Sequence, residues 1–102
     1  MKHFYLLILL LVTSFTFGQD IRNEGDIAGF KLYPNPVING RIYINTLQNA
    51  PKKIQIFDVF GTLVLETTIL GKELDLSGLG TGVYVLRVFE KDKIATRKLI
   101  VK

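Results

Sequence analysis

Few side chains in this 102-residue sequence could act as nucleophiles or general bases. The chain contains no cysteine, and its one histidine is His3, close to the N-terminus. Ser77 is the one serine beyond the N-terminal apolar segment, and a serine nucleophile normally depends on an imidazole base. We therefore interpret Ser77 as a turn hydroxyl beside Gly78, and the sequence predicts a protein that is not an enzyme.

A glycine-rich segment could in principle cradle a phosphate. Gly78, Gly80 and Gly82 are closely spaced, as in phosphate-binding loops. Such a loop needs a helix N-terminus behind it, whereas residues 83–86 have the composition of a strand. We therefore interpret the three glycines as a bend in the backbone.

The charged residues do not favour a metal or nucleic-acid site. Asp58, Asp75 and Asp92 carry oxygens that suit calcium, but they are scattered over separate predicted turns, and we expect no cofactor. The chain has 13 basic and 9 acidic residues, a net charge of +4. No cluster of lysine and arginine alternates with aromatic residues, so we expect no nucleic-acid partner.

The N-terminus has the pattern of a secretory signal peptide. Residues 1–3 are positively charged, residues 4–12 are almost wholly apolar, and small residues precede a predicted cleavage between Gly18 and Gln19. The apolar run is about 14 residues long, which is short of the roughly 20 that cross a bilayer. We therefore predict a cleaved signal peptide at 1–18 and no transmembrane segment in the mature chain.

The mature chain is expected to contain a short polar linker, 19–29, and one domain, 30–102. In this domain the apolar residues alternate with a period of two, which is typical of strands. Turn residues recur about every ten positions, among them Gly61, which we expect to have positive φ in a type I turn with a bulge. A polar hairpin turn is predicted at 90–93. The predicted strands are 30–33, 41–45, 53–57, 62–68, 73–76, 83–89 and 94–101.

Six to seven short antiparallel strands predict an all-β fold, a small immunoglobulin-like β-sandwich, with a small barrel as the alternative. Alternation also predicts which side chains face the core. The expected core residues are Ile42, Ile44, Ile54, Ile56, Leu63, Leu65, Leu74, Leu76, Leu79, Tyr84, Leu86, Val88, Leu99 and Val101.

An ordered set of short motifs resembles the type A C-terminal sorting domain of type IX secretion, also called the Por secretion tag. The resemblance spans roughly residues 30–102. The motifs are Tyr33, Pro34, Asn35, Pro36 and Val37, then Gly40, then 54–58 ahead of Gly61, then 74–77 with Leu79, Gly82, Tyr84 and Leu86, and finally Lys98, Leu99, Ile100, Val101 and Lys102.

This resemblance implies a function in export. Such domains are immunoglobulin-like sandwiches of Bacteroidota that follow exported enzymes and adhesins. A chain of this kind is exported via the periplasm, and its tag directs it through the type IX outer-membrane translocon to the outer membrane, cell surface or extracellular space. Sortase and shuttle components are the implied further partners; the sortase removes the tag and can couple the passenger to lipopolysaccharide.

By resemblance, the recognition element is the C-terminal segment 98–102, whereas Gly82 and Tyr84 shape the fold. A terminal strand can serve as a signal because a sheet edge and a chain end can both be captured by backbone pairing. Family members carry a passenger before the tag, and here only about eleven residues, 19–29, separate the predicted signal from the domain.

Several alternatives remain open at this stage. The chain could be a separate protein that uses the domain as a module, a gene remnant, or a small surface protein. A different class is a secreted binding or adhesion module that resembles fibronectin type III. The sequence does not define the oligomeric state.

Overall fold

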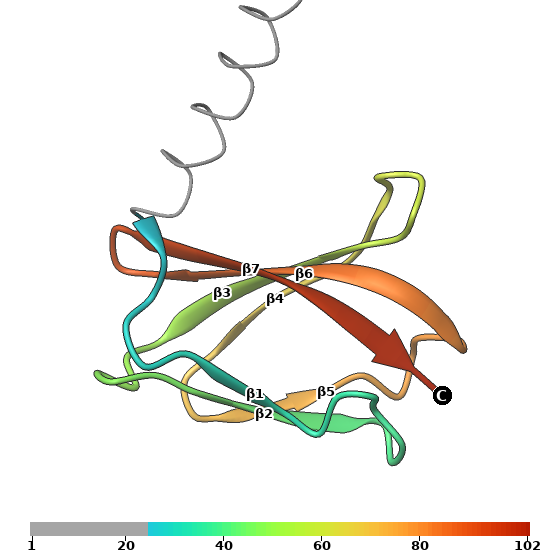
Figure 1. Ribbon diagram of the computed structural model, residues 1–102, viewed down its shortest axis with the longest axis horizontal. Helices are drawn as coiled ribbons and strands as arrows, with labels where there is room; N and C mark the ends of the chain where they lie inside the picture. Colours follow the sequence, from blue (N-terminus) through green and yellow to red (C-terminus); the bar gives the residue numbers. More distant parts are fainter. Residues whose placement is uncertain (1–24) are drawn as a thin grey trace, which may run out of the picture.

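A computed structural model describes residues 25–102 as two antiparallel sheets packed face to face (Figure 1). One sheet has the order β1 (Lys31–Tyr33), β2 (Arg41–Asn45), β5 (Glu73–Asp75). The other has the order β4 (Leu63–Ile69), β3 (Lys52–Phe57), β6 (Gly82–Glu90), β7 (Lys93–Val101). The prediction of an all-β, immunoglobulin-like sandwich is confirmed, with seven strands.

The core lies between the two sheets and follows the predicted alternation. Ile42 and Ile44 on β2 face Ile54 and Ile56 on β3, and all four are fully buried. Leu65, Leu79 and Tyr84 are half-buried and pack against this core. Other buried apolar residues, not expected from the pattern, are Ile27, Val37, Ile69 and Ala95.

Leu63 is the one expected core residue that lies outside. It is 45% exposed, although Leu65, two positions later, packs against the core. The pairing of β3 with β4 shifts between Ile56, which faces Leu65, and Phe57, which faces Leu63. The extra residue, Val64, is a bulge, and it turns Leu63 to the outer face that Phe57 occupies. The prediction for Leu63 was therefore wrong because a bulge breaks the two-residue period.

The turn between β3 and β4 confirms the prediction for Gly61, which has φ of 87°. The amide of Gly61 donates to the carbonyl of Asp58, and the amide of Asp58 donates to the carbonyl of Thr62. The Asp58 carboxylate also accepts hydrogen bonds from the amides of Phe60 and Thr62. These bonds close a compact hairpin turn.

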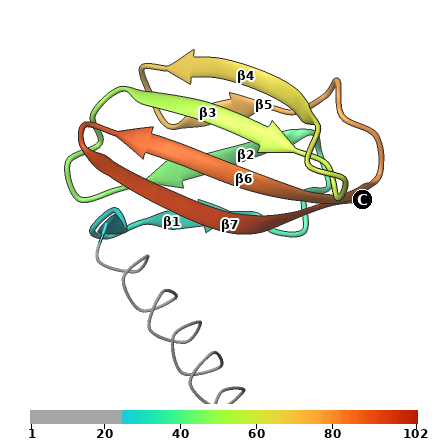
Figure 2. The same cartoon turned by 90° about the horizontal axis from the view of Figure 1, so that it is seen from above.

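The sandwich has two poles, which Figure 2 shows at opposite ends of the four-stranded sheet. The described chain starts at one pole, together with the β6–β7 turn; we call this the entry pole. The C-terminus lies at the other, with the β3–β4 turn; we call this the C-terminal pole. The register agrees, because Phe89 pairs with Lys53 near the entry pole and Val85 pairs with Phe57 near the C-terminal pole.

The segment before β1 contributes to this fold. Ile27 is buried in the core, and the amide of Leu47 donates to the carbonyl of Ala28. Asp26 forms an ion pair with Arg97 of β7 at 3.0 Å, and the Arg97 guanidinium lies 4.7 Å from the centre of the Phe30 ring. Residues from Asp26 onward are therefore part of the packed domain.

Candidate functional site

The proline-containing motif at 33–37 lies against the C-terminal strand. The side-chain amide nitrogen of Asn35 donates to the carbonyl of Lys98 at 2.9 Å. The amide of Ile100 donates to the side-chain oxygen of Asn35 at 3.1 Å. A carboxamide carries the same donor and acceptor as a peptide unit, so Asn35 continues the sheet ladder beyond β7 with its side chain.

Val37 extends this contact with its backbone. Its amide donates to the carbonyl of Ile100 at 2.7 Å, and its carbonyl accepts a bond from the amide of Lys102 at 2.9 Å. The two segments form a parallel bridge between Val37 and Val101, and the Val37 side chain is fully buried. We call residues 35–37 the edge strap, because they cover the outer edge of the last strand.

The edge strap leaves the predicted recognition segment, residues 98–102, without a free backbone edge. β6 pairs with one edge of residues 98–101, and the edge strap occupies the other edge as far as Lys102. Leu99 and Val101 point into the core, whereas Lys98 and Lys102 are exposed. A partner that paired with this backbone edge would first have to displace the strap.

Gly82 and Tyr84 lie at the start of β6. Gly82 is the first residue of β6 and not part of the bend, which contains Gly78 and Gly80, and a strand follows the glycine-rich segment. The Tyr84 hydroxyl donates to the carbonyl of Gly80 at 2.7 Å, while its ring packs against the core. A tyrosine at the start of this strand that bonds back to the preceding loop is typical of immunoglobulin-like sandwiches.

Ser77 also lies in a turn, where its amide donates to the carboxylate of Asp75 at 2.9 Å. Hydrogen bonds from the Ser77 backbone and side chain, with a smaller contribution from Arg41, lower the pKa of Asp75 below 3.8. Asp58 and Asp92 lie in other turns. Among residues 25–102, no three histidine, cysteine, aspartate or glutamate side chains gather into a possible metal site.

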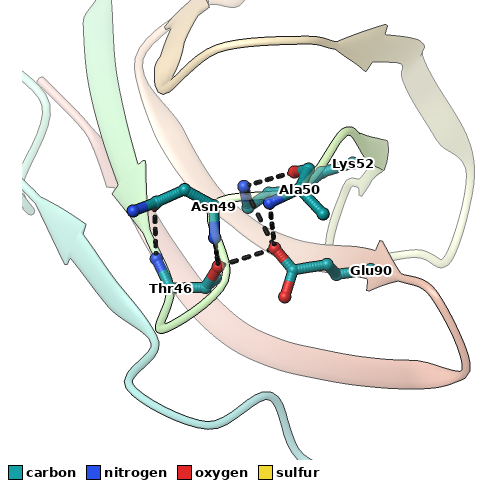
Figure 3. Close-up of polar contacts among 5 residues, drawn as sticks. All are labelled: Thr46, Asn49, Ala50, Lys52 and Glu90. Carbon is teal, nitrogen blue, oxygen red and sulfur yellow. Dashed lines mark hydrogen bonds and ion pairs between the residues drawn. The ribbon is translucent and has the colours of Figure 1, made fainter.

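A buried ion pair that the sequence reading missed lies near the entry pole (Figure 3). Lys52 and Glu90 approach to 3.2 Å, with side-chain exposures of 0% and 5%. We expected Glu90 in a polar hairpin turn, but it is the last residue of β6 and points inward. Alternation could have identified both residues, because Lys52 shares a face with Ile54, and Glu90 shares one with Val88.

One carboxylate oxygen of Glu90, on β6, contacts both the β2–β3 connection and the first residue of β3. Oε2 accepts hydrogen bonds from the Thr46 hydroxyl at 2.6 Å and from the Ala50 amide at 3.1 Å, besides the Lys52 ammonium (Figure 3). Lys52 in turn donates to the Ala50 carbonyl at 2.7 Å. Burial raises the pKa of Glu90, but the bonds from Thr46, Lys52 and Ala50 outweigh it and hold the pKa below 4.5. The pair therefore joins the β2–β3 connection to β6.

A pocket of about 160 Å³ lies beside this network at the entry pole, with Ile27, Leu47, Glu90 and Lys93 in its lining. Small-molecule sites usually enclose roughly 300–1,000 Å³. The pocket mixes apolar side chains with charges of both signs and is small for a substrate.

The fold and the site define a small immunoglobulin-like β-sandwich domain whose C-terminal strand is fixed along both edges. The comparisons with known proteins agree. The model of the family described as secretion system C-terminal sorting domain matches residues 31–102, so the chain belongs to this family. A domain of this family is a non-catalytic signal of type IX secretion.

A solved structure has the same fold. It is the structure of PorZ, described as an essential bacterial surface component of the type-IX secretion system of human oral-microbiomic Porphyromonas gingivalis. The match has 24% identity and a TM-score of 0.56, and it covers 72% of this chain and 11% of the PorZ chain. No curated protein matches the sequence significantly. Within the described residues, no helix is long and apolar enough to cross a bilayer.

Proposed function

We propose that residues 25–102 act as the export signal that directs this chain through the periplasm and across the outer membrane by type IX secretion. The domain performs no chemistry on a substrate. Its partners are the outer-membrane translocon and the sortase and shuttle components of that system. The recognition element is the C-terminal segment 98–102, and the product is delivered to the cell surface or the extracellular space.

One observation carries this proposal beyond the family match. Lys98 and Lys102 are exposed at the end of a strand that is fixed along both edges, at the pole opposite the one where the described chain starts (Figure 1). Sequence placed ahead of residue 25 therefore attaches far from the recognition element. This geometry suits a signal that has to be read in the same way behind any passenger, and it favours a sorting role over a fibronectin-III-like binding module.

The test is a reporter inserted between residues 24 and 25 of the full chain, produced in a type IX host. We expect the reporter at the cell surface. Lys98→Gln combined with Lys102→Gln should leave the reporter in the periplasm, because both side chains are exposed and their loss removes a recognition feature without removing core packing. The matched control is Lys91→Gln with Lys93→Gln, two exposed lysines at the entry pole.

Deletion of residues 98–102 is a less specific test, because it also removes buried Leu99 and Val101. Reporter that stays in the periplasm with the unaltered domain would contradict the sorting function. Delivery that is insensitive to the change at Lys98 and Lys102 would contradict the assignment of the recognition element alone.

A further inference from the structure

The closed edges of β7 restrict how a partner can contact the C-terminal strand. Its backbone between Lys98 and Lys102 is paired with β6 on one side and with the edge strap on the other. Leu99 and Val101 are buried. The side chains left for a partner include Lys98 and Ile100, which alternate with the buried pair and lie on the outer face of the four-stranded sheet. A partner that recognises this strand therefore has to approach the outer face of the sheet. This inference rests on the proposed sorting function.

The strand register arranges that outer face in rows across the sheet, which Figure 2 shows with the four strands side by side. The first row that crosses all four strands at the C-terminal pole contains Leu63, Phe57, Val85 and Lys98, in that order. The next row contains Glu66, Gln55, Arg87 and Thr96, all polar. Val83 and Ile100 form a further pair beyond the first row, toward the pole.

The apolar side chains of the first row and of this pair make one apolar surface at the C-terminal end of the sheet. The polar row separates this surface from Phe89 and Ile94, which pair near the entry pole. We call it the outer apolar patch, and its members are Phe57, Leu63, Val83, Val85 and Ile100. Val83 and Leu63 are 43% and 45% exposed, and neighbouring strands lie about 4.8 Å apart, so the first row spans about 14 Å. Outward positions of a sandwich strand are usually polar, so a contiguous apolar area there indicates an interaction surface.

The β3–β4 turn adds an aromatic side chain beside this patch. Figure 1 shows the turn rising beyond the outer face of the sheet. Phe60 in this turn is 89% exposed, and its own amide is bonded to the Asp58 carboxylate at 2.9 Å. An aromatic side chain on an ordered turn loses little conformational freedom on binding, which is typical of residues that dominate interface energies.

The charges on the same face define the chemistry of the partner. Over the rows of the sheet, the cations are Lys98, Arg87 and Lys53, and the one acid is Glu66, which lies 3.9 Å from Lys53. The face is therefore basic as well as apolar. Two copies placed face to face would bring like charges together, which disfavours self-association. A surface that is apolar and bordered by carboxylates would be complementary.

We infer that the outer apolar patch is the docking surface of the domain, and that it binds face-on to an export component with an apolar surface bordered by carboxylates. The partner contacts the side chains of β6, β7 and the β3–β4 turn while the edge strap stays in place. This mode differs from strand addition, in which the partner would pair with the backbone of β7.

The test uses the same reporter inserted between residues 24 and 25. Val83→Thr with Val85→Thr removes apolar surface but keeps β-branched side chains, so the sheet should be preserved. We expect surface reporter to fall about tenfold, which corresponds to a loss of about 1.4 kcal/mol of binding. Ile94→Thr is the matched control, because Ile94 and Val85 are both 38% exposed, on the same sheet but at opposite poles.

Thermal unfolding of the purified chains shows whether each variant is folded. If the double variant proves unstable, Leu63→Thr on the edge strand β4 replaces it. Surface delivery of a folded patch variant at the unaltered level would overturn the docking surface while leaving the sorting function intact. No delivery by the unaltered chain would overturn the sorting function, and the docking surface with it.

Two further measurements test the chemistry of the partner. Arg87→Glu should reduce delivery and Arg87→Lys should not, because only the first reverses the charge that a carboxylate-bordered surface would meet. Equal delivery by the two variants would overturn the charge complementarity. Sedimentation of the purified chain should show a monomer; a dimer that Val83→Thr with Val85→Thr dissociates would overturn the inference by making a second copy the occupant.

Discussion

The amide of Ile100 donates a hydrogen bond to the side-chain oxygen of Asn35 at 3.1 Å, which joins two residues 65 positions apart in the sequence. The same asparagine donates to Lys98, so one side chain pairs with both sides of a peptide segment in the last strand. The contact joins the first motif of the family resemblance to the last one. The two motifs are therefore one structural unit, in which the first fixes the strand that the second supplies.

Replacement of Asn35 by alanine should weaken this unit. Both hydrogen bonds would be lost, and we expect the free energy of unfolding to fall by about 1–2 kcal/mol. Chemical denaturation would measure the loss, and hydrogen exchange at the Ile100 amide should accelerate by more than exchange at core amides such as Leu86. Asn39→Ala is the matched control, because Asn39 is exposed and makes no side-chain hydrogen bond among the described residues. Equal effects of the two changes would show that the two side-chain hydrogen bonds of Asn35 contribute nothing to stability.

Tyr84 offers a second test, because its ring and its hydroxyl make separate contacts. Tyr84→Phe removes the bond to Gly80 and should cost about 1 kcal/mol. Tyr84→Ala also removes the ring from the core and should cost roughly 2–4 kcal/mol, since the ring is half-buried. Urea unfolding of both variants separates the two contributions. A phenylalanine variant as unstable as the alanine variant would contradict this division.

Replacing the lysine of the buried ion pair should lower the free energy of unfolding much more than replacing the lysine of the neighbouring exposed pair. Lys52→Met leaves the Glu90 carboxylate buried without its cation, and we expect a loss of about 3–5 kcal/mol. Adding Glu90→Gln removes that charge, so the double variant should recover part of the loss. Lys53→Met is the control, because Lys53 and Glu66 form an exposed pair at 3.9 Å and the change should cost under about 0.5 kcal/mol. Additive effects of the Lys52 and Glu90 changes would argue against their coupling.

Acid should weaken the domain through Glu90. Its pKa in the folded chain lies below 4.5, so the unfolded chain binds the proton more readily. The stabilisation is therefore complete above about pH 4.5 and is lost as the pH falls through the lowered pKa. Unfolding measured from neutral pH downward should show the stability difference between the unaltered chain and Glu90→Gln shrinking in that acidic range. A difference that stays constant with pH would contradict the role of the Glu90 charge.

Local sequence patterns were sufficient to predict most of the strands. The alternation at 41–45 and 94–101, and glycine at position 61, each depend on neighbouring residues alone, because a strand period and a positive φ are properties of a short segment. The same locality explains the error at Leu63. A bulge in the pairing with β3 moved Leu63 to the outer face, and only the partner strand defines that shift.

No local sequence pattern predicted the contacts between segments that are distant in the sequence. Lys52 and Glu90 were readable as inward positions, but not as partners, and nothing near Asn35 in the sequence points to Ile100. By itself, then, the sequence determined the class of fold, the motifs of the family and the lack of an obvious catalytic set. Only the tertiary structure decided that the edge of the last strand is closed and that its exposed side chains join an apolar face. The physical reason is that sheet packing sets which backbone groups are already paired, and no local pattern encodes that pairing.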